Sequence, residues 1–248
     1  MQRSEPAYVD RIRKKYNGID EIWDASDRWH FWTKRQIEQV LVAAGHEFLK
    51  ETSGDGVILD VGSAGHAYFP SNCFRVDIDI AENSLRSCTH PVCANAEALP
   101  FASAIADLTV CVGPVVNYCS LEEVVSELAR STKSNGSLIL HVELSNSWEH
   151  FGSKAYCADA AFVTSFYRGL ENYWVYSDSY VRRVLANYGF SVTGTRYFHI
   201  LSSLAYRLIG RPNVSSYFGI ADRVLGGLSI FGSIADSAIY LARREAPQ

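Results

Sequence analysis

The stretch from Val57 to Asp77, VILDVGSAGHAYFPSNCFRVD, constrains the fold more than any other part of the chain. It opens with an apolar run that is typical of a parallel strand covered on both faces, and this run ends at Asp60. Gly62 and Gly65 then allow a sharp turn and a close approach of the backbone to a ligand. Ligands of parallel α/β sheets bind beyond the carboxyl ends of the strands, so Asp60 and Asp77 can meet one ligand. A ribose diol would suit the second acid.

Strand-like and helix-like segments alternate along the rest of the chain. Strands are expected at 74–77, 91–94, 107–112, 137–143, 190–198 and 237–243, and helices at 121–131 and 179–188. Parallel neighbours need crossover connections, so the pattern predicts an α/β fold: a Rossmann-like, seven-stranded, mostly parallel sheet with helices on both faces. The helical pattern of residues 4–50 adds a helical lid before the first strand.

The length of 248 residues suits one large α/β domain. We expect a single domain over residues 1–248, with an N-terminal helical lid at 1–50 and a ligand-binding core at 57–143. The connections at 144–178 and 199–234 are long for a compact domain, and such segments usually act as lids or binding walls. We therefore expect them on the substrate side.

Composition excludes several classes of protein. The net charge of -4 gives no general attraction for phosphate backbones, so a nucleic-acid partner is not expected. The six cysteines lack the spacing of a zinc site, so no metal ligands are expected. The N-terminus has no stretch suited to a signal peptide and no run is long enough to span a bilayer, which favours a cytoplasmic protein.

Five motifs occur in a fixed order along the chain: ILDVGSAG, FRVDID, ANAEALPF, ADLTVCVG and NGSLILHVE. Together they resemble the class I S-adenosylmethionine-dependent methyltransferases, in particular the small-molecule branch called type 11. The resemblance covers residues 57–143 and extends to SYVRRVLANYGFSV, which looks like the family's next helix and strand. It implies an enzyme that transfers a methyl group from S-adenosyl-L-methionine to a small molecule. Ala64 departs from the pattern, because a glycine is usual there.

The resemblance also implies a set of cofactor-binding residues on the loops after the first four strands. They are Asp60, Gly62, Ser63, Gly65, Asp77, Ile78, Asn95, Ala96, Glu97 and Gly113. In this arrangement the loop after Asp60 lies under the methionine part, Asp77 holds the ribose hydroxyls, and the turn at Asn95 contacts the adenine. A nicotinamide nucleotide is the alternative ligand, but the phosphate-cradling G-x-G-x-x-G is absent.

For the acceptor we expect a partly apolar metabolite that is methylated on a hydroxyl. The proton would go to His150 or His199, which follow the carboxyl ends of expected strands. The residues expected to contact the acceptor are Asn117, Tyr118, Glu143 and Trp32.

Two alternatives remain open at this point. One is a lipid-linked glycan or another membrane-associated acceptor, because residues 200–234 are rich in large apolar side chains. Core packing is the preferred interpretation of that segment, since its cationic residues are few. The other is a non-catalytic module that binds the cofactor.

Overall fold

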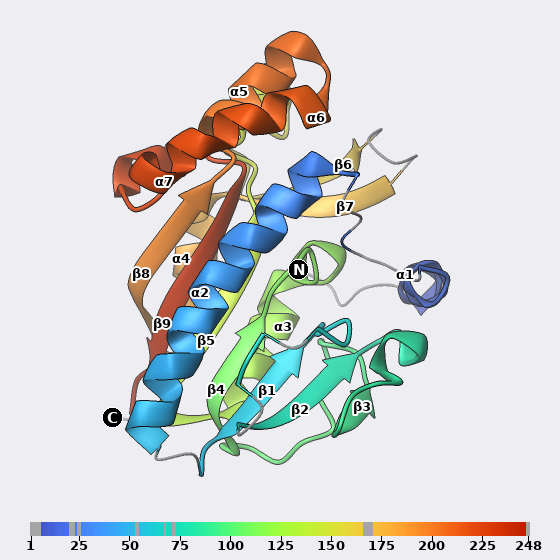
Figure 1. Ribbon diagram of the computed structural model, residues 1–248, viewed down its shortest axis with the longest axis vertical. Helices are drawn as coiled ribbons and strands as arrows, with labels where there is room; N and C mark the ends of the chain where they lie inside the picture. Colours follow the sequence, from blue (N-terminus) through green and yellow to red (C-terminus); the bar gives the residue numbers. More distant parts are fainter. Residues whose placement is uncertain are drawn as a thin grey trace.

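The computed structural model describes residues 6–19, 23, 26–52, 55–66, 68–70, 73–165 and 171–246. A seven-stranded sheet with the order β3-β2-β1-β4-β5-β9-β8 runs through its centre (Figure 1). The strands are β1 (Val57–Val61), β2 (Phe74–Asp79), β3 (Pro91–Cys93), β4 (Ala106–Cys111), β5 (Thr132–Glu143), β8 (Phe190–Phe198) and β9 (Ser237–Arg244). The first five pair in parallel, whereas β9 is antiparallel to both of its neighbours. The predicted fold class is confirmed.

Helices cover both faces of the sheet. α2 (Arg28–Thr52) buries Ile37 and Leu41 against one face, in one cluster with Ile58. α3 (Leu121–Ser131) and α4 (Asp178–Asn187) pack on the other face, in the cluster that contains Leu59. The neighbouring residues Ile58 and Leu59 thus pack against helices on opposite faces of the sheet, because successive side chains of a strand point to opposite faces.

The remaining elements gather near the carboxyl ends of the parallel strands (Figure 1). They are α1 (Pro6–Asn17), the hairpin of β6 (Ala160–Ser165) and β7 (Glu171–Tyr176), and the short helices α5 (Ile200–Ile209), α6 (Pro212–Ser215) and α7 (Asp222–Leu225). Turns of 3₁₀-helix lie at η1 (Glu82–Leu85), η2 (Val116–Tyr118), η3 (Trp148–His150), η4 (Ser216–Ala221) and η5 (Ser229–Ser233). The hairpin was not predicted: residues 144–178 were expected to form a substrate-side insertion, and no strands were assigned within it.

The segment at 200–234 packs as core only on its inner side. Ile200 is fully buried, whereas the side chains of Leu208, Val224 and Ile230 are 77%, 78% and 74% exposed. The preferred interpretation of this segment therefore needs correction, because much of its apolar surface faces outward. Among the described helices, none combines the length and the apolar character that crossing a bilayer requires.

Candidate active site

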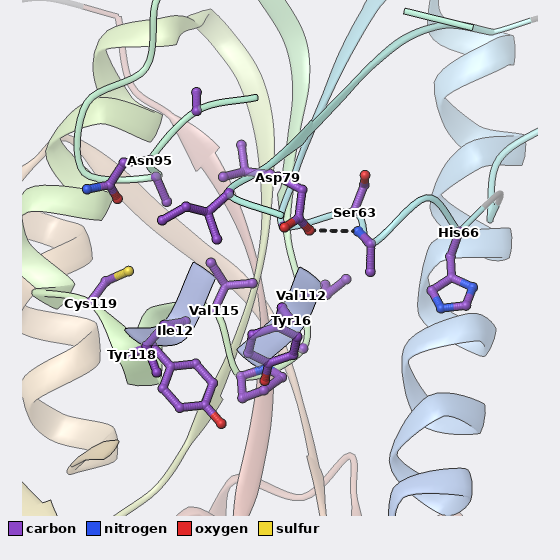
Figure 2. A pocket seen from close by; sticks show the side chains of 18 of the residues that line it. Ile12, Tyr16, Ser63, His66, Asp79, Asn95, Val112, Val115, Tyr118 and Cys119 are labelled. Atoms are coloured by element: carbon purple, nitrogen blue, oxygen red, sulfur yellow. Dashed lines mark hydrogen bonds between the residues drawn. The ribbon is translucent and has the colours of Figure 1, made fainter. Parts of the chain in front are cut away.

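A cavity lies at the carboxyl ends of β1, β2 and β4, and we call it the cofactor cavity (Figure 2). Loop residues 62–64 and 112–115 line it from below, together with Asp79 and Asn95. α1 closes it with Val9, Ile12 and Tyr16. Of the N-terminal helices, α1 thus lies over the cavity, while α2 forms a layer of the fold.

The loop after β1 has a backbone conformation at Gly62 that a residue with a side chain would not fit. Gly62 has a φ of +75°, and a Cβ there would lie 2.1 Å from Cγ2 of Val115. The N–H groups of Gly62 and Ser63 both donate to the carbonyl of Ile78, at 2.7 and 3.1 Å. Ala64 also has a positive φ, 49°, at the position where the resembled family usually has glycine. The loop therefore keeps its turn at Gly62 and joins β1 to the end of β2.

Asp79 is the acid that faces the cofactor cavity from β2. Its carboxylate accepts hydrogen bonds from the backbone N–H of Ala64 at 3.0 Å, drawn in Figure 2, and of Ala81 at 2.8 Å. Burial raises the pKa of Asp79, and the backbone hydrogen bonds to Ala81 and Ala64 oppose that rise. The carboxylate is thus held in one orientation at the mouth of the strand.

Asp77, the acid expected to hold a ribose, lies deeper in the sheet. It is 1% exposed, and the guanidinium of Arg75 lies 3.1 Å from its carboxylate. It is the register partner of Asp60 in the β1–β2 pair. β2 runs two residues further than predicted, to Asp79, and only its last acid reaches the cavity. The expectation for Asp77 is corrected accordingly: Asp79 occupies the place assigned to it.

Asp60 also lies below the cavity. It is fully buried, and among the described residues neither of its carboxylate oxygens has a hydrogen-bond partner. Burial raises the pKa of Asp60 to about 7; Arg75 lowers it, and Asp77 and Asp79 raise it further. Loss of hydration on burial is the main cause, and the two neighbouring carboxylates add to it because each disfavours the charge of the next.

The other predicted cofactor residues divide into two groups. Gly62, Ser63, Asn95, Ala96 and Gly113 line the cofactor cavity. The cofactor cavity is not lined by Gly65, Ile78 or Glu97. Ile78 is part of the core, and the Glu97 carboxylate accepts a hydrogen bond from the backbone N–H of Ser120 at 2.7 Å. These positions support the wall from behind.

A second cavity adjoins the first, and we call it the acceptor cavity. Four residues line both: Tyr16, Trp23, Pro114 and Tyr118. Most of its other lining residues are acidic or aromatic. The acidic ones are Glu143, Glu149, Glu171 and Asp236, and the aromatic ones are Trp29, Tyr173 and Tyr206; Lys15 and His30 also line it. Of the four residues expected to contact the acceptor, Tyr118 and Glu143 line this cavity.

Glu171, at the start of β7, links the hairpin to both cavities. It forms an ion pair with Lys15 of α1 and accepts a hydrogen bond from the hydroxyl of Tyr118. The ring of Tyr118 meets that of Tyr16 edge-on, with centroids 5.8 Å apart. α1 is therefore held over the cofactor cavity by a residue 156 positions away in sequence from Lys15.

The two histidines expected to act as bases lie elsewhere. His199 is fully buried, stacks on Trp29 with centroids 3.9 Å apart, and has Thr33 Oγ1 and Ser202 Oγ each 2.9 Å from its ring nitrogens. Burial lowers the pKa of His150 to about 4, and neither histidine lines a cavity described above.

His30 is the histidine that lines the acceptor cavity. Its Nδ1 lies 2.8 Å from a carboxylate oxygen of Asp27, whose other oxygen accepts a hydrogen bond from the backbone N–H of His30 at 3.1 Å. The Asp27-x-x-His30 spacing at the start of a helix is the sequence signal that could have singled it out. Nothing local, however, shows that this turn reaches the cavity.

Asn117 and Trp32, both expected to contact the acceptor, are used within the fold. The amide of Asn117 is bonded to the backbone of Glu143 and Trp174, and Trp32 donates from Nε1 to Asp222 at 3.1 Å. Neither lines the acceptor cavity. In the described ranges there is also no group of three His, Cys, Asp or Glu side chains placed to hold a metal ion.

Comparison with known proteins supports this description. A family model described as "Methyltransferase domain" matches residues 59–140. No curated protein matches the chain.

Several solved structures share the fold. One described as an S-adenosylmethionine dependent methyltransferase from Listeria monocytogenes is 15% identical, with a TM-score of 0.56 over 82% of this chain and 100% of that one. The 1,6-didemethyltoxoflavin-N1-methyltransferase of Burkholderia thailandensis, solved with S-adenosylhomocysteine, is 12% identical, with a TM-score of 0.54 over 99% of this chain and 93% of that one.

Geranyl diphosphate C-methyltransferase from Streptomyces coelicolor A3(2), also solved with S-adenosylhomocysteine, is 14% identical, with a TM-score of 0.54 over 98% of this chain and 100% of that one. At these identities the likeness establishes the fold, while the family match lies on the part of the chain that builds the cofactor cavity. Residues 59–140 thus match a methyltransferase domain, and the chain has the fold of solved S-adenosylmethionine-dependent methyltransferases.

Proposed function

We propose that this enzyme moves the methyl group of S-adenosyl-L-methionine to a small molecule bound in the acceptor cavity. The observation that carries the proposal is the junction of the two cavities at Tyr16, Pro114 and Tyr118. Methyl transfer needs the nucleophile, the methyl carbon and the sulfur in line, and two cavities that share one wall provide such a path.

The residues of the cofactor cavity fit the cofactor. Asp79 offers a fixed carboxylate to the ribose hydroxyls, and Ile80, Ala94 and Val115 give apolar surface for the adenine, with the Asn95 amide at its edge. No described Lys or Arg side chain lines this cavity, so the pyrophosphate of a nicotinamide nucleotide would find no cation there. When bound, the cofactor supplies a methyl group on a sulfonium, which is already a good leaving group.

The task of the protein is then positioning and the exclusion of water. α1 covers the cofactor cavity, and the Lys15–Glu171 pair with the Tyr118 hydroxyl ties α1 to the hairpin. We assign proton transfer to His30, whose Nδ1 is held by Asp27. This replaces the expected bases, because His150 and His199 lie outside the acceptor cavity.

Calorimetric titration with S-adenosylhomocysteine tests the cofactor site. Asp79→Asn keeps the size of the side chain but loses a charged acceptor, so affinity should fall about 10-fold to 100-fold, as expected for hydrogen bonds to a charged group. Asp55→Asn, an exposed change in the turn before β1, should bind as the wild type does. Equal affinity for wild type and Asp79→Asn, or stabilisation by a nicotinamide nucleotide instead, contradicts the proposal.

A second candidate function is methylation of a membrane-associated acceptor. Residues 200–234 expose large apolar side chains, and their only acid, Asp222, is buried, whereas Arg207, Arg211 and Arg223 are exposed. An apolar and cationic surface suits an anionic membrane. Tyr206 and Pro212 of the same segment line the acceptor cavity.

Co-sedimentation with vesicles of phosphatidylcholine, with and without phosphatidylserine, tests this candidate. Binding to the anionic vesicles that is reduced in Val224→Ser would support it, because the side chain of Val224 is 78% exposed. Absence of binding to either vesicle would exclude it and leave the main proposal in place.

A further inference from the structure

Resting on the proposed function, we infer that the acceptor is a small amine that binds as a cation between Glu143, Glu149 and Asp236 and is methylated on nitrogen. The inference differs from the hydroxyl acceptor that the sequence predicted.

Three carboxyl groups from separate elements line the acceptor cavity. Glu143 ends β5, Glu149 lies in η3, and Asp236 directly precedes β9. In the part of the chain that the structure describes, none of the three forms an ion pair with Lys, Arg or His. The fourth carboxylate, Glu171, is already paired with Lys15. The cavity therefore holds three carboxyl groups that have no ion-pair partner among the described residues.

Glu143 is the carboxyl group whose surroundings best suit a ligand that donates hydrogen bonds. Its backbone is fixed by Asn117, yet no described group donates a hydrogen bond to its carboxylate, which lines the cavity. Burial raises its pKa well above the usual value, as do Asp236, Glu149 and Glu171, and Lys15 opposes the rise. Glu143 is half-buried, so a ligand that donates to its carboxylate would replace contacts with water that burial reduces.

The neighbouring acids show the same effect. Burial and Asp236 raise the pKa of Glu149 to about 8, and burial raises that of Asp236 to about 6 against hydrogen bonds from Ser147 and Ser237. Asp222 raises the pKa of Asp236 further, and the interaction with His30 lowers it. A ligand with a positive charge would relieve this repulsion, whereas a neutral hydroxyl would leave it unchanged.

The aromatic walls favour an organic cation. Trp29, Tyr118, Tyr173 and Tyr206 line the same cavity as the acids. Ring faces attract ammonium groups, and carboxylates add hydrogen bonds to their N–H groups. A metal ion is a poorer match, because no three described His, Cys, Asp or Glu side chains are arranged as its ligands.

The chemistry balances without a further reactant. The bound ammonium first gives one proton to a base, which we assign to His30 or to one of the three carboxylates. The nitrogen lone pair then forms the N–C bond to the methyl carbon while the C–S bond breaks, and its electron pair stays on sulfur as a neutral thioether. The product is a methylated ammonium, so the positive charge stays among the carboxylates and the base later releases its proton to solvent.

Matched pairs of small probes test the inference. Thermal shift and transfer of a labelled methyl group are measured at pH 8 with S-adenosylmethionine and with phenethylamine or tryptamine, against 2-phenylethanol or tryptophol, which carry a hydroxyl in place of the amine. We expect stabilisation and methylation by at least one amine and neither effect with its alcohol. Stronger effects with the alcohols, or none with either amine, overturn the inference.

Variants distinguish amine binding in the acceptor cavity from cofactor binding. Glu149→Gln should weaken amine binding at least 10-fold and leave affinity for S-adenosylhomocysteine unchanged, and Glu51→Gln, exposed and paired with Arg243, should alter neither. Unchanged amine binding in Glu149→Gln and in Glu143→Gln overturns the inference alone. Failure of the wild type to bind S-adenosylhomocysteine overturns the proposed function and the inference with it.

Discussion

Asn117 holds Glu143 by both polar groups of its backbone: the Asn117 amide donates to the Glu143 carbonyl at 3.1 Å and accepts from its N–H at 3.1 Å. The same amide donates to the carbonyl of Trp174 in β7 at 2.7 Å. One fully buried side chain therefore joins η2, the end of β5 and the hairpin. It fixes where the Glu143 carboxylate enters the acceptor cavity.

Asn117→Ala should lower the free energy of unfolding and displace Glu143. It leaves buried backbone groups without partners, each worth about 1–3 kcal/mol, so chemical denaturation should show a loss of that order. Asn187→Ala, on an exposed position of α4, should cost much less. A loss in Asn117→Ala no larger than in Asn187→Ala would show that the three contacts carry little energy.

Glu171→Gln should loosen α1 without unfolding the protein. The ion pair with Lys15 is partly exposed, so the free energy of unfolding should change by only about 0–1 kcal/mol. Hydrogen exchange in residues 6–17 and the release rate of S-adenosylhomocysteine should both rise several-fold. Lys14→Gln breaks an exposed ion pair with Asp10 within α1 and serves as the control. Unaltered exchange in Glu171→Gln would mean that other contacts hold α1 closed.

Stability should fall as pH rises from about 4 to about 7, with Asp60 as a main cause. Its folded pKa of about 7 lies above the unfolded value of about 4. A raised carboxyl pKa means that the folded state binds the proton more tightly, so the stabilisation present at low pH is lost as pH rises through the folded pKa. Asp60→Asn should flatten the urea-unfolding profile across this window, while Asp55→Asn should not. A wild-type profile that rises with pH across the window would refute the assignment.

Gly62→Ala should destabilise the loop after β1. The new Cβ would lie 2.1 Å from Val115, on a backbone with φ of +75°, so we expect a loss of about 1–3 kcal/mol and much weaker binding of S-adenosylhomocysteine. Gly227→Ala is the matched control, since a Cβ there meets nothing within 4 Å and the backbone of Gly227 is outside the left-handed region. If both variants behave alike, the close approach at Gly62 has no functional consequence.

Helices and strands with a clear periodicity of apolar residues could be predicted from the sequence. The helix at 121–131 and the strand at 190–198 have the expected bounds, because their apolar residues repeat at helical or strand spacing. The hairpin of β6 and β7 was missed, since it depends on the pairing of two six-residue runs, of which only β7 is rich in aromatic residues. Two residues of extra length in β2 were enough to move the cavity-facing acid from Asp77 to Asp79.

The acceptor cavity could not be predicted from sequence patterns. Glu149, Glu171 and Asp236 belong to three segments that meet only when the hairpin and β9 are in place. His30 starts a helix whose other residues pack on the sheet, so its place in the cavity depends on the whole fold. His150 and His199 follow strands in sequence, but His199 is fully buried in contact with α2, and neither histidine lines the acceptor cavity.

A crystal structure of the complex with S-adenosylhomocysteine tests the central claim most directly. The account predicts ribose hydroxyls within hydrogen-bonding distance of the Asp79 carboxylate and the sulfur directed at the junction of Tyr16 and Tyr118. A ligand whose ribose lies away from Asp79, or whose sulfur points away from the acceptor cavity, would contradict it.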